Sequence, residues 1–169
     1  GMGRYPADGN ASMALLYYRT AVELVVGQWL LWIGLAGAAA ALWKRWRWPL
    51  ALLALPPAFY LWSLYSSGTP IFVPTLWPHS YYNSRYALTA LPLVALGAAA
   101  IVSALHRPFR RVAVLLTMFA IGVHWKTVRT PDQWLVWKEA QHNSQTRLGW
   151  TRQAASFLRA NYRGGDGIL

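Results

Sequence analysis

Four long apolar stretches, separated by two short clusters of basic residues and one polar loop, constrain the fold of this chain more than any other feature. They cover residues 22–43, 49–65, 86–105 and 109–125. A helix of about 20 apolar residues spans the ~30 Å hydrocarbon core of a bilayer. We therefore expect an all-α polytopic membrane protein, with about four transmembrane helices in residues 1–125 and an amphipathic helical tail in residues 126–169.

The distribution of charge predicts an orientation for these helices. The 169 residues include 16 Lys and Arg but only 5 Asp and Glu, a net charge of +11. In a soluble protein this excess would suggest nucleic-acid binding. Here the cations gather at the ends of apolar stretches, in residues 44–48 and 106–111, as is typical of cytoplasmic loops. We expect an inner (plasma) membrane protein with both chain ends on the non-cytoplasmic side, membrane lipids as partners and no nucleic acid.

Several kinds of chemistry lack the residues they need. The chain has no cysteine, which excludes disulfides and thiolate metal sites. Its five carboxylates include no pair placed for general acid–base catalysis. Glycine-rich phosphate loops, zinc-binding histidine pairs and nucleophile elbows are also missing. The residues alone therefore predict no catalytic group, no metal site and no cofactor.

The outer loop at residues 66–85 carries the most distinctive polar sequence. Three prolines, Pro70, Pro74 and Pro78, exclude a regular helix or a central strand. Arg85 is the only Lys or Arg between the two basic clusters. It lies at the predicted outer boundary, against the positive-inside bias. A guanidinium in that position can hold a phosphate through two parallel hydrogen bonds.

The side chains around Arg85 suit a sugar phosphate. Tyrosines offer hydroxyl donors and a stacking surface, histidine can donate or accept near neutral pH, and an asparagine amide can bind sugar hydroxyls. The candidate substrate-binding residues are Arg85, Tyr82, Tyr86, His79, Tyr81 and Asn83. An aromatic belt, with Arg85 extending to lipid headgroups, is the alternative. The residue types leave both interpretations open.

The tail becomes amphipathic after the fourth apolar stretch. Thr130, Pro131 and Gln133 match a helix start with a capping box, which predicts a helix to about Gln141. A second helix is expected over residues 145–162, with its arginines mostly off the apolar face. We expect this tail to lie on the outer surface or to begin an outer domain.

Taken in order, these features resemble the C-terminal half of bacterial GT-C integral-membrane glycosyltransferases, relatives of the protein O-mannosyltransferases and the lipid A aminoarabinose transferase. The matching loop, residues 73–86, reads Val-Pro-Thr-Leu-Trp-Pro-His-Ser-Tyr-Tyr-Asn-Ser-Arg-Tyr. The tail at residues 152–166 resembles the helix that leads into the small outer domain of some of these enzymes.

This resemblance implies transfer of a sugar from a polyprenyl-phosphate donor to an acceptor on the outer face. Arg85 would contact the donor phosphate, with Tyr82, Tyr86 and His79 around it. The family's catalytic carboxylate lies in an early outer loop, which has no counterpart in this chain. We therefore expect the C-terminal membrane part of such an enzyme, inactive alone and completed by the rest of the parent protein.

A small non-catalytic membrane scaffold or assembly protein is the alternative function. A transporter fragment is a weaker option, because the apolar stretches offer almost no polar residues at mid-membrane depth.

Overall fold

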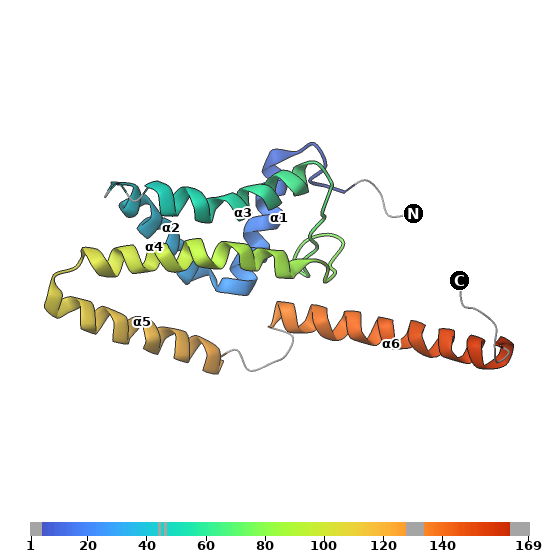
Figure 1. Ribbon diagram of the computed structural model, residues 1–169. Coiled ribbons are helices and arrows are strands. Elements are labelled where there is room, and N and C mark those ends of the chain that lie inside the picture. The colour runs from blue at the N-terminus through green and yellow to red at the C-terminus, as the bar shows by residue number, and fades with distance from the viewer. Residues whose placement is uncertain (1–4, 44, 46, 128–133, 163–169) are drawn as a thin grey trace.

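The computed structural model describes residues 5–43, 45, 47–127 and 134–162. Apart from its loops, this part of the chain is helical (Figure 1), which confirms the all-α prediction. Among the described residues, the β pairing is one isolated antiparallel bridge between Phe72 and Tyr82. The elements are α1 (Ala11–Val26), α2 (Gln28–Trp43), α3 (Arg47–Tyr65), the 3₁₀ helix η1 (Ser84–Ala90), α4 (Leu91–Ala104), α5 (Arg107–Thr127) and α6 (Leu135–Asn161).

Three of the four apolar stretches form helices close to their predicted bounds. They correspond to α3, to η1 continued by α4, and to α5. Pro92 lies in the first turn of α4, where its missing N–H removes no helical hydrogen bond. α5 has 21 residues and extends the predicted 109–125 by two residues at each end, so that it begins at Arg107 and ends at Thr127.

The first predicted span, residues 22–43, is not one straight helix. α1 and α2 meet at Gly27 with a bend of 109°. Gly27 has φ 94° and ψ 136°, a conformation that residues with a side chain rarely adopt. α1 also begins much earlier than expected, at Ala11, because the Asn10 side chain caps it by accepting a hydrogen bond from the Met13 amide at 3.2 Å.

Glycines allow α2 and α4 to pack at very short range. A Cβ atom at Gly34 would lie 2.6 Å from Val94 Cγ1, and one at Gly37 would overlap the Gly97 carbonyl. In turn, a Cβ at Gly97 would overlap the Gly34 carbonyl. Membrane helices associate through such small-residue contacts, because lipid provides no hydrophobic drive between them.

The helices differ in how well they would suit a membrane. Within the described residues, one helical stretch, Ser84–Ala104, is long and apolar enough to cross a bilayer. The bent pair of α1 and α2 would be a second if it forms one broken span. α3 and α5 have 19 and 21 residues, but prolines and aromatics in α3, and arginines in α5, lower their hydropathy. Four crossings therefore stay a prediction.

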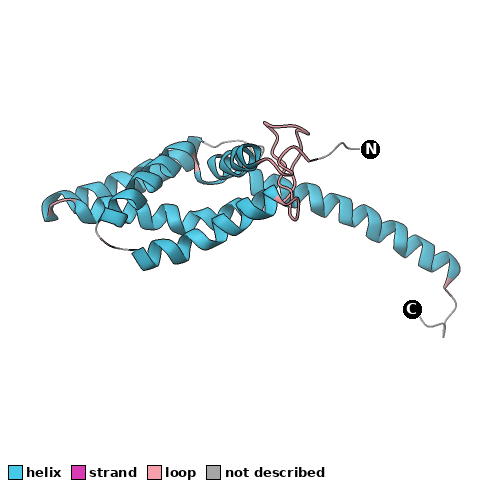
Figure 2. Ribbon diagram, turned by 90° about the horizontal axis from the view of Figure 1, so that it is seen from above, coloured by secondary structure: helices cyan, strands magenta, loops and turns pink. Residues whose placement is uncertain are grey.

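The described part of the tail forms one helix, where two were predicted. α6 continues without a break through residues 142–144, because this segment contains neither proline nor glycine to end it. The predicted start signals at residues 130–133 lie outside the described residues, as does the tail beyond residue 162. α6 runs away from the rest of the molecule (Figure 2).

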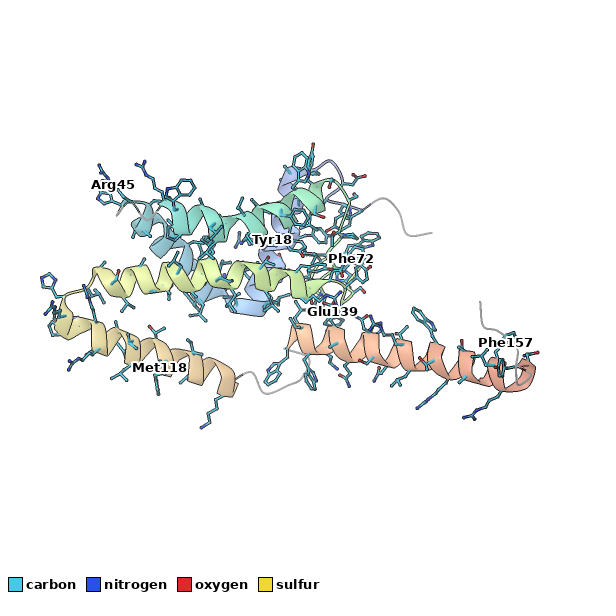
Figure 3. The ribbon with its side chains drawn as sticks, viewed as in Figure 1. Tyr18, Arg45, Phe72, Met118, Glu139 and Phe157 are labelled. Atoms are coloured by element: carbon cyan, nitrogen blue, oxygen red, sulfur yellow. The ribbon has the colours of Figure 1, made fainter. Side chains whose placement is uncertain are left out.

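The two ends of the helical body differ in character. The turns joining α2 to α3 and α4 to α5 lie together at one end, and the loop between α3 and η1 lies at the opposite end (Figure 1). Arg45 marks the basic end in Figure 3. The described residues of the two basic clusters therefore share one end of the body, as a common cytoplasmic side requires.

Candidate functional site

The loop between α3 and η1, residues 66–83, is here called the connector. Its two arms are joined by the Phe72–Tyr82 bridge, with N···O distances of 3.0 and 3.3 Å. Asn83 closes the loop in a left-handed conformation (φ 57°), which asparagine tolerates better than most residues. Its Nδ2 donates to the Pro70 carbonyl at 3.0 Å. The connector is thus a defined loop despite its prolines.

Two tyrosines from the N-terminal part of the chain hold the connector against α1. The Tyr5 hydroxyl donates to the Ile71 carbonyl at 3.1 Å, and the Tyr17 hydroxyl donates to the Trp77 carbonyl at 2.5 Å. Burial raises the pKa of the Tyr5 phenol above its ordinary value, so the hydroxyl stays a neutral donor. Ile71 and Val73 of the connector are fully buried in the hydrophobic core, and Tyr5 packs against the same core.

A carboxylate from α6 anchors the end of the connector. Glu139 is only 3% exposed. Its Oε1 accepts a hydrogen bond from the Asn83 amide at 2.9 Å, and its Oε2 accepts from the Ser84 amide at 2.6 Å and from the Ser84 hydroxyl. These donors begin η1, where a negative charge is favoured by the helix dipole and satisfies free N–H groups. Glu139 therefore joins α6 to the start of the most apolar helical stretch (Figure 3).

Arg85 is the cation of the site. Its side chain is exposed, and its Cζ lies 5.3 Å from the Tyr86 ring centroid. Tyr86 in turn stacks on Tyr60 of α3, with ring centroids 4.6 Å apart. Within the described part of the chain, the structure gives Arg85 no carboxylate at ion-pair distance. The guanidinium thus rests on an aromatic support, and those of its five N–H donors that the Tyr86 side chain does not take are open to a ligand.

The six predicted site residues fall into three groups by exposure. Arg85, Tyr82 and His79 are exposed, Tyr81 and Tyr86 are half-buried, and Asn83 is buried. Asn83 uses its amide group within the loop, and His79 Nδ1 lies 2.9 Å from the Pro74 carbonyl oxygen. The structure therefore leaves Arg85, Tyr82 and His79 accessible. Among the described residues, no hydrogen bond links His79 with Arg85.

The sequence interpretation missed the groups that hold the connector: Glu139, Ser84, Tyr5 and Tyr17. Ser84 offered a signal, since a serine at the start of an apolar helix favours an N-terminal role. Glu139 offered only its rarity, as one of five carboxylates. Its contacts are 55 and 56 residues away in sequence, a separation that local patterns do not reveal.

Two of the described carboxylates, Glu139 and Glu23, are engaged in contacts within the protein. Glu139 is engaged by the backbone, and Glu23 Oε1 lies 2.9 Å from Arg19 Nε in an i,i+4 ion pair. The described residues contain no group of three or more His, Cys, Asp and Glu side chains placed to hold a metal ion. The exposed Arg85 and Tyr82 present donors suited to an anionic ligand, whereas Glu139 and Glu23 are not free to act as a general base.

Comparison of the chain with protein-family models, with curated proteins and with solved structures found no match.

Proposed function

We propose that this chain is the C-terminal membrane part of a glycosyltransferase that moves a sugar from a polyprenyl-phosphate donor to an acceptor on the outer face of the membrane. Its own contribution is to bind the phosphate of the lipid carrier at the connector. The exposed Arg85 guanidinium, supported by Tyr86 at the start of the most apolar helix, is the observation that carries this proposal.

The position of Arg85 suits a phosphate attached to a lipid. It is the second residue of Ser84–Ala104, the stretch able to cross a bilayer, so its guanidinium would lie near the headgroup level. Arginine matches phosphate in geometry and is always charged. A phosphate at this depth is the group that a polyprenyl carrier presents, with its chain in the hydrocarbon.

The neighbouring side chains support distinct roles in this proposal. The exposed Tyr82 and His79 would contact the sugar or phosphate, and Tyr86 would support Arg85. Tyr81 is half-buried against the core, and Asn83 shapes the loop. Because the connector is fixed by Tyr5, Tyr17 and Glu139, it is ordered before ligand binds, which reduces the entropy cost of binding.

The proposed membrane arrangement has four crossings. These are α1 with α2, then α3, η1 with α4, and α5. Both basic turns lie at one end of the body, which supports a cytoplasmic position for them, an outer position for the connector, and chain ends on the outer side. The rest of the parent enzyme would supply the catalytic carboxylate.

Binding of polyprenyl phosphate to the chain in lipid nanodiscs tests the proposal. We expect the wild-type chain to bind polyprenyl phosphate more tightly than unphosphorylated polyprenol. Arg85→Ala should weaken phosphate binding about 10- to 100-fold, because it removes charge-assisted hydrogen bonds of about 1.5–3 kcal/mol. Equilibrium titration followed by native mass spectrometry measures both affinities.

Arg152→Ala is the matched control, since Arg152 is also exposed but lies on the distant part of α6. It should leave the affinity unchanged. Equal affinity of the wild-type chain for polyprenol and polyprenyl phosphate would contradict the proposal, as would equal losses in the two variants.

A non-catalytic scaffold is the second candidate function, and one observation favours it. The distal part of α6 exposes large apolar side chains, including Trp150 and Phe157, which are 67% and 66% exposed. Such residues are enriched at protein interfaces. A scaffold predicts that binding of a protein partner depends on Trp150 and Phe157 and not on Arg85.

A further inference from the structure

An open cavity is lined by residues of α4 and α5, together with Val26 of α1 and Leu30 of α2. Its volume is about 600 Å³, within the range of ligand pockets. Small α4 residues such as Ala95, Ala98 and Ala99 line one wall, and Val114 and Ile121 of α5 line the other. Because α4 carries alanines on this face, the two helices leave a groove between them. We call it the α4–α5 groove.

Arg110 lines this otherwise mostly apolar groove and marks its basic end. Its Nε donates to the Leu105 carbonyl at 2.9 Å, and one terminal nitrogen donates to the Ser103 carbonyl at 2.7 Å. A guanidinium has five N–H donors, so three remain after these two bonds. The side chain is exposed. Arg110 is therefore fixed in place at the end of α4 and can still bind an anion.

Further positive charge surrounds the same end of the groove. Arg107 is one turn before Arg110 on the same face of α5, and Arg111 follows directly. All three lie in the first turn or so of α5, where the helix dipole also favours an anion. The groove thus combines an apolar wall with a cationic end, which is the charge pattern complementary to an anionic amphiphile.

The length of the groove corresponds to one leaflet of a bilayer. Its α4 lining runs from Leu91 to Ser103, a rise of ~18 Å for twelve residues. One leaflet contributes ~15 Å of the ~30 Å hydrocarbon core. An alkyl chain that enters at Arg110 would therefore follow α4 to about the middle of the membrane or slightly beyond.

We propose that the α4–α5 groove binds an anionic phospholipid of the leaflet at the basic end of the molecule. One acyl chain lies along Ala98 and Val114, and the phosphate lies at Arg110, Arg107 and Arg111. The proposal rests on the membrane location given under the proposed function, but its site, its ligand and its leaflet differ from those of the connector.

Lipid retention by the purified full chain tests this proposal. The chain is transferred from nanodiscs containing equal amounts of phosphatidylglycerol and phosphatidylcholine into the gas phase, and native mass spectrometry counts the lipids retained. We expect phosphatidylglycerol to be preferred about tenfold, because its headgroup carries a net negative charge whereas that of phosphatidylcholine is zwitterionic, and nearby arginines each contribute about 1 kcal/mol toward an anionic lipid. Arg107→Gln combined with Arg111→Gln should remove most of this preference, and the hydrogen bonds from Arg110 to the Leu105 and Ser103 carbonyls should remain.

Ala98→Phe tests the apolar wall by filling the groove, and retention of both lipids should fall. Leu116→Phe is the matched control, because Leu116 is exposed and does not line the groove; it should change neither quantity. Equal retention of the two lipids by the wild-type chain would overturn the proposal. Unchanged retention in Ala98→Phe, or a lipid-free dimer closed across the groove, would overturn it as well.

The same measurement separates this site from the connector. Arg85→Ala should leave the preference for phosphatidylglycerol intact, and the Arg107 and Arg111 variant should leave polyprenyl phosphate binding intact. Failure of one site is therefore visible independently of the other.

Discussion

At the scale of single residues, the site contains two opposite charges, Glu139 and Arg85, that make different contacts and do not form an ion pair. Glu139 is buried, and its carboxylate accepts hydrogen bonds from the backbone amides of Asn83 and Ser84. Arg85, which follows Ser84 in the sequence, is exposed and lies over the Tyr86 ring. The buried carboxylate fixes the backbone immediately before Arg85, and so fixes the direction in which the guanidinium leaves the helix.

Glu139→Gln should loosen this junction. The substitution places an NH₂ group near backbone donors and removes charge-assisted hydrogen bonds, each contributing about 1.5–3 kcal/mol. We expect the local opening free energy at residues 83 and 84 to fall by about that amount. Hydrogen-exchange mass spectrometry of a peptide covering these residues measures the change.

Glu23→Gln is the carboxylate control, because the exposed Arg19–Glu23 pair contributes only about 0.3–0.5 kcal/mol. Amide exchange at residues 83 and 84 that is equally slow in both variants would show that Glu139 does not hold the junction.

At the scale of helices, the close approach of α2 and α4 determines the body of the molecule. The backbones meet at Gly34, Gly37 and Gly97, where the structure has no room for a Cβ atom. Ala41 and Ala100, both buried, extend the contact toward the basic end. This packing also places α4 so that its other face is left to line the α4–α5 groove.

Gly97→Ala should therefore destabilise the body despite being a conservative change. The added methyl would overlap the Gly34 carbonyl, and forced overpacking costs about 1–3 kcal/mol. We expect a lower thermal unfolding midpoint in detergent. Gly122→Ala is the control, because a Cβ there has no neighbour within 4 Å; it should leave the midpoint unchanged or raise it slightly.

Much of the helical pattern could be predicted from the sequence, and its exceptions have physical reasons. α3 and α5 follow apolar stretches, which give a strong local signal. The break at Gly27 was missed because glycine is common within membrane helices, as Gly34 and Gly37 show by remaining helical. Only the backbone conformation of Gly27 distinguishes it from them.

The candidate site was predictable to a smaller extent. The sequence identified Arg85, Tyr82 and His79, and all three are exposed at the connector. It also assigned Asn83 a binding role, and the structure shows that the Asn83 side-chain amide already donates to the Pro70 carbonyl. The substrate-binding roles of all these residues stay predictions. Residue type shows which side chains could bind a ligand. Whether a side chain is already hydrogen-bonded within the protein depends on the tertiary structure, which residue type does not show.

At the scale of the whole molecule, the two ends carry different chemistry. One end holds the basic turns and the cationic mouth of the α4–α5 groove. The other holds the connector with Arg85, from which α6 extends outward. In the proposed membrane arrangement each phosphate site would lie at its own membrane surface, and both proposals require the two ends to face opposite sides.

Single-cysteine labelling in intact cells measures this orientation most directly, because the chain has no native cysteine. Thr75 in the connector and Arg45 in the first basic turn are both exposed. We predict that a membrane-impermeant maleimide modifies Thr75→Cys in intact cells and modifies Arg45→Cys only after the cells are opened. The reverse pattern, or modification of both variants in intact cells, would contradict the account.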